Sequence, residues 1–121
     1  MTNPQPVTPA PPRPVVVTVP AEFDMSNADG IYNEITAAFA RSSRVVADMT
    51  ATTFCDTMAI RTLVLAHRQA PATGTELRLV VISPSVLRIM EVLGVDTMLP
   101  LYDSLEEALA GQGQDGGRAG P

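Results

Sequence analysis

The stretch Thr52-Thr53-Phe54-Cys55-Asp56-Thr57-Met58-Ala59-Ile60 joins a strand to a helix and sets the pattern for the whole chain. The run Arg44–Met49 before it predicts a strand, and apolar residues from Ile60 to His67 recur at helical spacing after it. Asp56 is a favourable N-cap for that helix, because its carboxylate can accept hydrogen bonds from first-turn N–H groups. Thr57 is therefore expected at the first helical position, with an exposed hydroxyl beside unpaired backbone N–H groups.

Strands and helices alternate on both sides of this stretch. The β-branched run Val15–Val19 predicts a strand. Ile31, Ile35 and Phe39 predict one face of a helix, with Ser26 as its candidate N-cap. Downstream we expect a strand over Leu77–Ile82, a helix from Pro84 to Gly94, a short strand over Leu99–Tyr102 and a last helix over Asp103–Ala110. This order predicts an α/β fold, a small and mostly parallel or mixed sheet packed with about four helices.

The ends of the chain differ in composition from its middle. Residues 1–14 hold six prolines and are predicted to be extended or disordered, and the Gly-rich residues 111–121 are predicted to be flexible. Residues 15–110 are then expected to form one domain. Hydrophobic residues make up 45% of the chain, which is ordinary for a protein with one packed core.

Charge and composition exclude several function classes. The net charge of −5 argues against nucleic acid and anionic membrane surfaces as partners, since both attract an excess of Lys and Arg. No apolar run approaches the length of a membrane span. One cysteine, Cys55, allows no intramolecular disulfide, and with one histidine, His67, it makes no typical zinc site. We interpret the chain as cytosolic, with no metal or cofactor.

No catalytic set is visible in the sequence. The chain has no Gly-rich phosphate loop, and Cys55 and His67 are twelve positions apart on one strand-turn-helix stretch, too far for a nucleophile–base pair. Cys55 is interpreted as a small apolar residue. Asp24, Asp48 and Asp56 could form a magnesium cluster, but Asp48 and Asp56 fit turn and cap positions better. We therefore do not expect an enzyme.

The stretch Phe54–Ile60 resembles the signature of the STAS family of anti-sigma-factor antagonists, Phe-x-Asp-Ser-Ser/Thr-Gly-Leu. Ala21-Glu22-Phe23-Asp24 resembles the family's turn before its first helix, and Leu79–Val86 resembles its strand-to-helix segment ending in Ser-Pro-x-Val. The segments Leu93–Asp96 and Leu105–Leu109 resemble its closing segments. The resemblance extends over roughly Val15 to Leu109.

This resemblance implies a function. In the family, a partner anti-sigma factor of the GHKL kinase class phosphorylates the hydroxyl residue that follows the signature aspartate, which is Thr57 here. The unphosphorylated antagonist binds the anti-sigma factor, which then releases its sigma factor. The resemblance assigns partner binding to Asp24, Asp56, Thr57 and Met58.

Several departures from the family pattern leave alternatives open. Met58 and Ala59 replace small residues next to the acceptor, and prolines replace the family's N-terminal edge strand, so that Val15–Val19 is expected at an exposed edge. One alternative is a STAS subunit of a membrane transporter complex, such as a lipid-exporting ABC system. Another is an antagonist that binds without phosphorylation control, with oxidation of Cys55 as one conceivable control. The oligomeric state and the partner's identity stay open.

Overall fold

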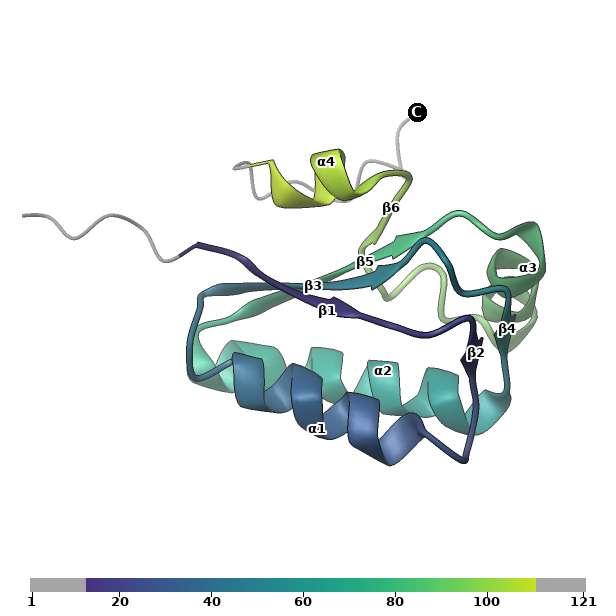
Figure 1. Ribbon diagram of the computed structural model, residues 1–121, viewed down its shortest axis with the longest axis horizontal. Helices are drawn as coiled ribbons and strands as arrows, with labels where there is room; N and C mark the ends of the chain where they lie inside the picture. Colours follow the sequence, from purple (N-terminus) through teal and green to yellow (C-terminus); the bar gives the residue numbers. More distant parts are fainter. Residues whose placement is uncertain (1–12, 111–121) are drawn as a thin grey trace, which may run out of the picture.

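The computed structural model describes residues 13–110 and shows an α/β domain with its helices on both sides of a parallel sheet (Figure 1). The elements in chain order are β1 (Val15–Thr18), β2 (Glu22–Phe23), α1 (Ala28–Ala38), β3 (Arg44–Met49), β4 (Phe54–Cys55), α2 (Thr57–Gln69), the 3₁₀ helix η1 (Ala70–Thr73), β5 (Glu76–Val81), α3 (Pro84–Leu93), β6 (Leu101–Tyr102) and α4 (Leu105–Leu109). The predicted tails lie outside the described residues, apart from Arg13 and Pro14.

The main sheet has the strand order β1-β3-β5-β6, and every neighbouring pair is parallel. Its register places Val15 opposite Val45 and Val45 opposite Leu77. The expected fold class is confirmed, and the strand bounds differ from expectation by one or two residues. Within residues 13–110, β1 pairs on one side only, and Val16 is 38% exposed, as expected for an edge.

Two layers of apolar side chains hold the sheet. Alternate strand residues face α1 and α2, which lie side by side against one face of the sheet (Figure 1). Ile35 and Phe39 of the α1 region and Leu63 of α2 are buried there, as their spacing predicts. A smaller cluster lies on the opposite face under α4 and consists of Val46, Val80, Tyr102 and Ala108. The short helix α4 therefore closes the face that α1 and α2 leave open.

Local hydrogen bonding explains where the helices begin and end. The prediction of Ser26 as an N-cap is wrong, because its backbone N–H and its hydroxyl both donate to Asp24 Oδ1, and α1 begins after Asn27. Ser104 caps α4 by accepting a hydrogen bond from the Glu107 N–H, so that helix starts later than expected. Gly94 ends α3 at a φ of +74°, a backbone conformation that glycine adopts without strain.

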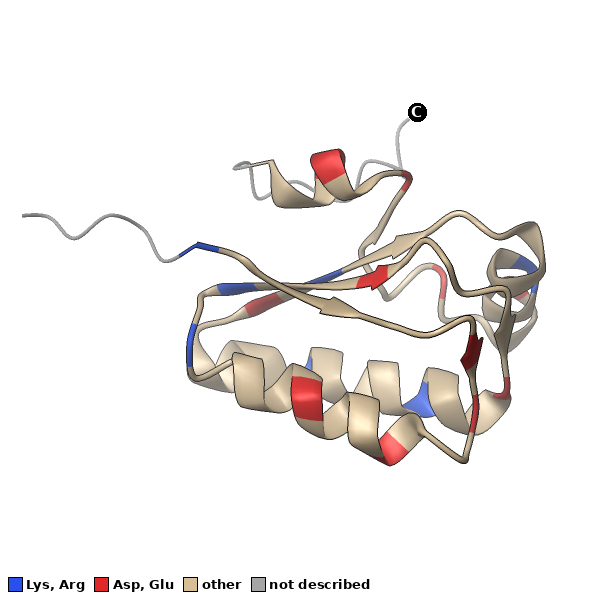
Figure 2. Cartoon of the chain, viewed as in Figure 1, with Lys and Arg blue, Asp and Glu red and all other residues tan. Residues whose placement is uncertain are grey.

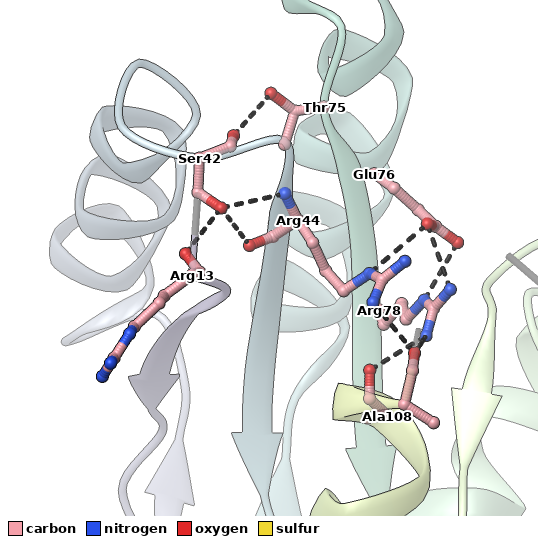
Figure 3. Close-up of polar contacts among 8 residues, drawn as sticks. Arg13, Ser42, Arg44, Thr75, Glu76, Arg78 and Ala108 are labelled. Carbon is pink, nitrogen blue, oxygen red and sulfur yellow. Dashed lines mark hydrogen bonds and ion pairs between the residues drawn. The ribbon is translucent and has the colours of Figure 1, made fainter. Parts of the chain in front are cut away.

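Arg78 is fully buried and connects α4 to strand β5 through hydrogen bonds (Figure 3). Arg78 Nε and Nη2 donate to the Glu76 carboxylate at 3.0 and 3.2 Å. Its Nη1 donates to the carbonyl oxygens of Ala108 and Ala110, both at 3.0 Å. The guanidinium also lies 5.2 Å from the centre of the Tyr102 ring. Arg78 thus satisfies carbonyl groups at the end of α4 that no further helical turn could satisfy.

Replacing Arg78 tests whether its hydrogen bonds stabilise the packing of α4 on the sheet. Arg78→Ala removes these bonds and leaves a void under α4, so we expect the free energy of unfolding to fall by about 3 kcal/mol. Urea denaturation followed by circular dichroism measures the change. Arg88→Ala, which removes an exposed arginine of α3, is the matched control and should change stability by less than about 0.5 kcal/mol. Equal stability of the two variants would contradict the role given to Arg78.

Candidate functional site

A second, two-stranded sheet forms one end of the domain, where the chain leaves β1 and β3 (Figure 1). Its parallel strands β2 and β4 pair Glu22 with Phe54 and Phe23 with Cys55. Thr52 is fully buried beside it, and its hydroxyl donates to the Pro20 carbonyl at 2.9 Å. The sequence did not predict this pairing, because strands of two residues show no alternation. The pairing brings the Asp24 turn next to the start of α2.

Asp56 connects the start of α2 to the loop that follows β2. As expected, it is the N-cap of α2, and its Oδ1 accepts a hydrogen bond from the Ala59 N–H at 2.8 Å. Its Oδ2 accepts a second hydrogen bond from the Met25 N–H at 2.9 Å, across 31 positions of sequence. One carboxylate therefore both begins the helix and fixes the loop after β2. Sequence reasoning found the first role and missed the second.

Asp24 lies in the loop that Asp56 fixes. Its Oδ1 accepts two hydrogen bonds from Ser26, and its backbone N–H donates to Asn27 Oδ1 at 2.9 Å. These bonds from the hydroxyl and the backbone of Ser26 hold the pKa of the Asp24 carboxyl below its usual value. Asp24 is thus a negatively charged group in an ordered turn. Because the Asp56 carboxylate accepts a hydrogen bond from the adjacent Met25, the structure brings the Asp24 turn and Asp56 together.

Thr57 is the first residue of α2 and is exposed, in the position that the sequence predicts. Large apolar side chains at this end of the domain are also exposed, and we call them the apolar rim: Met25 (71%), Phe54 (51%), Met58 (48%) and Ile82 (49%). The Ser85 hydroxyl donates to the Thr53 carbonyl at 2.8 Å, which holds the start of α3, just after Ile82, against the loop before β4. Exposed apolar groups at the same end of a domain as an exposed hydroxyl are typical of a protein-binding surface.

Met58 and Ala59, the two residues that depart from the family signature after Thr57, differ in their exposure. Met58 is half exposed and belongs to the apolar rim. The Ala59 side chain is fully buried, so its methyl group adds bulk to the core and not beside the Thr57 hydroxyl. Of the two replacements, only Met58 therefore adds exposed bulk next to Thr57 in the sequence.

Cys55 is buried, with 4% of its surface exposed. Burial, together with the nearby Asp56 carboxylate, raises the pKa of the Cys55 thiol to about 12. A thiol sensitive to oxidation needs exposure and a low pKa, and Cys55 has neither. This environment fits the interpretation of Cys55 as a small apolar residue and gives no support to control by oxidation.

A sizeable cavity lies on another part of the domain and does not include Thr57. It has a volume of about 750 Å³, and its lining includes His67, Leu77 and Met98 but none of the predicted site residues. Burial lowers the pKa of His67 and thereby favours a neutral imidazole, and its Nδ1 has no hydrogen-bond partner among residues 13–110. A smaller hollow of about 270 Å³ between α2 and α3 does include Thr57. Protein partners bind exposed surfaces, so cavity size does not decide which end is the site.

Residues 13–110 were also considered for a metal site and for a membrane-spanning helix. Between residues 13 and 110, no group of three or more His, Cys, Asp or Glu side chains could hold a metal ion. Over the same residues, no helix is long and apolar enough to cross a bilayer.

Comparison with known proteins identifies the class to which this fold and this site belong. The sequence model of the STAS domain matches residues 5–108, and the chain therefore belongs to the STAS domain family. No curated protein matches the sequence significantly.

Several solved structures share the fold. One is described as an anti-sigma factor antagonist from Mycobacterium paratuberculosis; it is 28% identical, covers 78% of this chain and 80% of its own, and has a TM-score of 0.70. A sulfate transporter family protein from Wolinella succinogenes is 15% identical over 79% and 81% of the two chains, with a TM-score of 0.68. The Bacillus protein SpoIIAA in its phosphorylated form is 17% identical over 84% and 92%, with a TM-score of 0.61. The last two likenesses show the fold alone.

Replacing Asp56 tests how this end is held together. Asp56→Ala removes both hydrogen bonds of the carboxylate, so we expect faster hydrogen exchange at the Met25 and Ala59 amides and a loss of about 1–2 kcal/mol of stability. NMR-detected exchange measures both amides. Asp29→Ala, which removes an exposed carboxylate from the first turn of α1, is the control and should leave both amides unchanged. Unchanged exchange at Met25 in Asp56→Ala would show that Asp56 does not hold that loop.

Proposed function

We propose that this chain is an anti-sigma factor antagonist that binds an anti-sigma factor kinase through the apolar rim around Thr57. Phosphorylation of Thr57 by that kinase ends the binding. Asp24, Asp56, Thr57 and Met58 contribute to the contact surface, together with the other residues of the apolar rim.

The observation that carries this proposal is the position of the Thr57 hydroxyl. It is exposed at the start of α2, and the half-exposed Phe54 and Met58 lie within three positions of it. A hydroxyl in such a place is accessible to a kinase, and a charge added to it lies within a surface that a partner would desolvate. The 28% identity to a protein described as an anti-sigma factor antagonist supports the same function. SpoIIAA, described as phosphorylated, supports the idea that this fold can carry a phosphate.

The phosphorylation step needs ATP, which the kinase would bring. The Thr57 Oγ attacks the γ-phosphorus, an O–P bond forms to threonine, the bond to the β-phosphate oxygen breaks, and ADP leaves. A base on the kinase accepts the hydroxyl proton. In this scheme the chain is the substrate and the kinase is the catalyst.

The phosphate would oppose binding for two physical reasons. It adds about −1.5 to −2 charges at neutral pH, close to the carboxylates of Asp24 and Asp56. It also places a strongly hydrated group among the apolar side chains of the rim, where a docked partner would remove its water. Like charges and lost hydration both lower the affinity for a partner that fits the unmodified surface.

A pull-down with variant baits tests the proposal. Wild type should recover an anti-sigma factor kinase from the native cytosol, and Thr57→Glu should bind it at least tenfold more weakly, because a fixed charge replaces the hydroxyl. Thr97→Glu adds the same charge to an exposed threonine of the α3–β6 loop and should bind like wild type. Thr57→Ala should bind but remain unphosphorylated when the partner and ATP are supplied.

Other outcomes would favour the alternatives. Equal recovery of the anti-sigma factor by wild type and Thr57→Glu would support an antagonist without phosphorylation control. Recovery of transporter subunits by both baits would support a role in a membrane transporter complex. A phosphate found on Thr57→Ala would show that another hydroxyl is the acceptor.

A further inference from the structure

Thr57 and the positively charged side chain of Arg61 line the same small hollow. The hollow of about 270 Å³ between α2 and the end of α3 is lined by Thr57, Ile60, Arg61, Val64, Leu93 and Val95. Arg61 follows Thr57 by four residues, the spacing at which two side chains lie one above the other on the same side of a helix. The hydroxyl of Thr57 and the guanidinium of Arg61 therefore belong to one side of α2.

The guanidinium of Arg61 is not used by an ion pair within the described residues. Its side chain is exposed. The buried arginine of the domain, Arg78, shows the opposite behaviour, since Glu76 and two carbonyl groups hold it. Figure 2 shows α2 with basic segments and with no acidic segment of its own. The charge of Arg61 is thus available to an anion at the start of α2.

One backbone donor at the start of α2 is already occupied, and the adjacent carboxylate would repel a phosphate. The Ala59 N–H already donates to Asp56, and the Asp56 carboxylate places a negative charge directly before Thr57. A phosphate on Thr57 would therefore need a cation nearby to offset that charge. A guanidinium is the side chain best suited to this, because its planar donors match two phosphate oxygens at once.

We propose that Arg61 is the internal partner of the phosphate on Thr57, and that the two side chains pair across the α2–α3 hollow. This inference rests on the proposed phosphorylation of Thr57. In the unmodified chain Arg61 contributes a free positive charge next to the partner-binding surface. In the phosphorylated chain the pair replaces that free charge by a bulky, net negative group fixed on α2. Phosphorylation then changes the net charge of the Thr57–Arg61 pair from positive to negative.

The pairing can be measured without any kinase. Phosphothreonine is placed at position 57 of the full chain by genetic-code expansion, and ³¹P NMR follows its second ionisation between pH 4 and 9. A nearby cation favours the dianion, so the second pKa of the phosphate should be lower in the chain with Arg61 than in Arg61→Gln. The expected difference is roughly half a pH unit for a pair near the surface. Salt at 1 M should reduce it, since salt screens exposed charges.

Two further variants make the result specific. Arg68→Gln removes an exposed arginine from the same helix, about 10 Å farther along its axis than Arg61, and should titrate like wild type. Arg61→Lys keeps the charge and should retain most of the difference. If Arg61→Gln titrated like Arg68→Gln, or if Arg61→Lys titrated like Arg61→Gln, the proposal would be overturned.

This test separates the inference from the proposed function. An unchanged pKa in Arg61→Gln removes the role of Arg61 and leaves phosphorylation of Thr57 intact. Failure of a native kinase to phosphorylate Thr57 removes the proposed switch, even where the installed phosphate pairs with Arg61.

Discussion

The carboxylate of Asp56 is the constraint on which the β2–β4 end of the domain depends. Its two oxygens accept hydrogen bonds from Ala59 in α2 and from Met25 in the loop after β2. The first bond fixes where the helix begins, and therefore where Thr57 lies. The second bond holds the Asp24 turn and the most exposed side chain of the apolar rim against that helix start. Asp56 thus adds a direct bond between residues 31 positions apart to the β2–β4 pairing that already brings these segments together.

The rest of the domain supports that end without contributing to it. Because β1 and β3 are parallel, both end on the same side of the main sheet, and the segments that follow them pair there as β2 and β4. Arg78 closes the other face of the sheet by holding α4, which buries Val46 and Tyr102 (Figure 3). One end of the domain is therefore free to expose apolar groups, because packing elsewhere supplies the stability.

Residue preferences and apolar periodicity predicted most of the helices and main-sheet strands. The features that they did not predict depend on contacts between residues that are distant in sequence. The helix start at Asp56 and the turn at Gly94 follow from preferences of single residues, and the structure confirms both. The Ser26 cap was wrong because the Asp24 carboxylate competes for the serine's backbone and hydroxyl groups. The β2–β4 pair and the Met25–Asp56 bond depend on contacts between distant residues that no periodicity reveals. Burial of Arg78 was equally invisible, since a charged residue in a strand usually faces solvent.

The central claim is that the unmodified β2–β4 end, together with Thr57 at the start of α2, is the partner-binding surface. Hydrogen-exchange mass spectrometry of the chain, alone and bound to the recovered anti-sigma factor, tests it most directly. The account predicts slower exchange in residues 22–26 and 53–58 on binding, and no change in α4 or at the exposed edge of β1. Slower exchange confined to α4 and β1, with residues 53–58 unaffected, would contradict it.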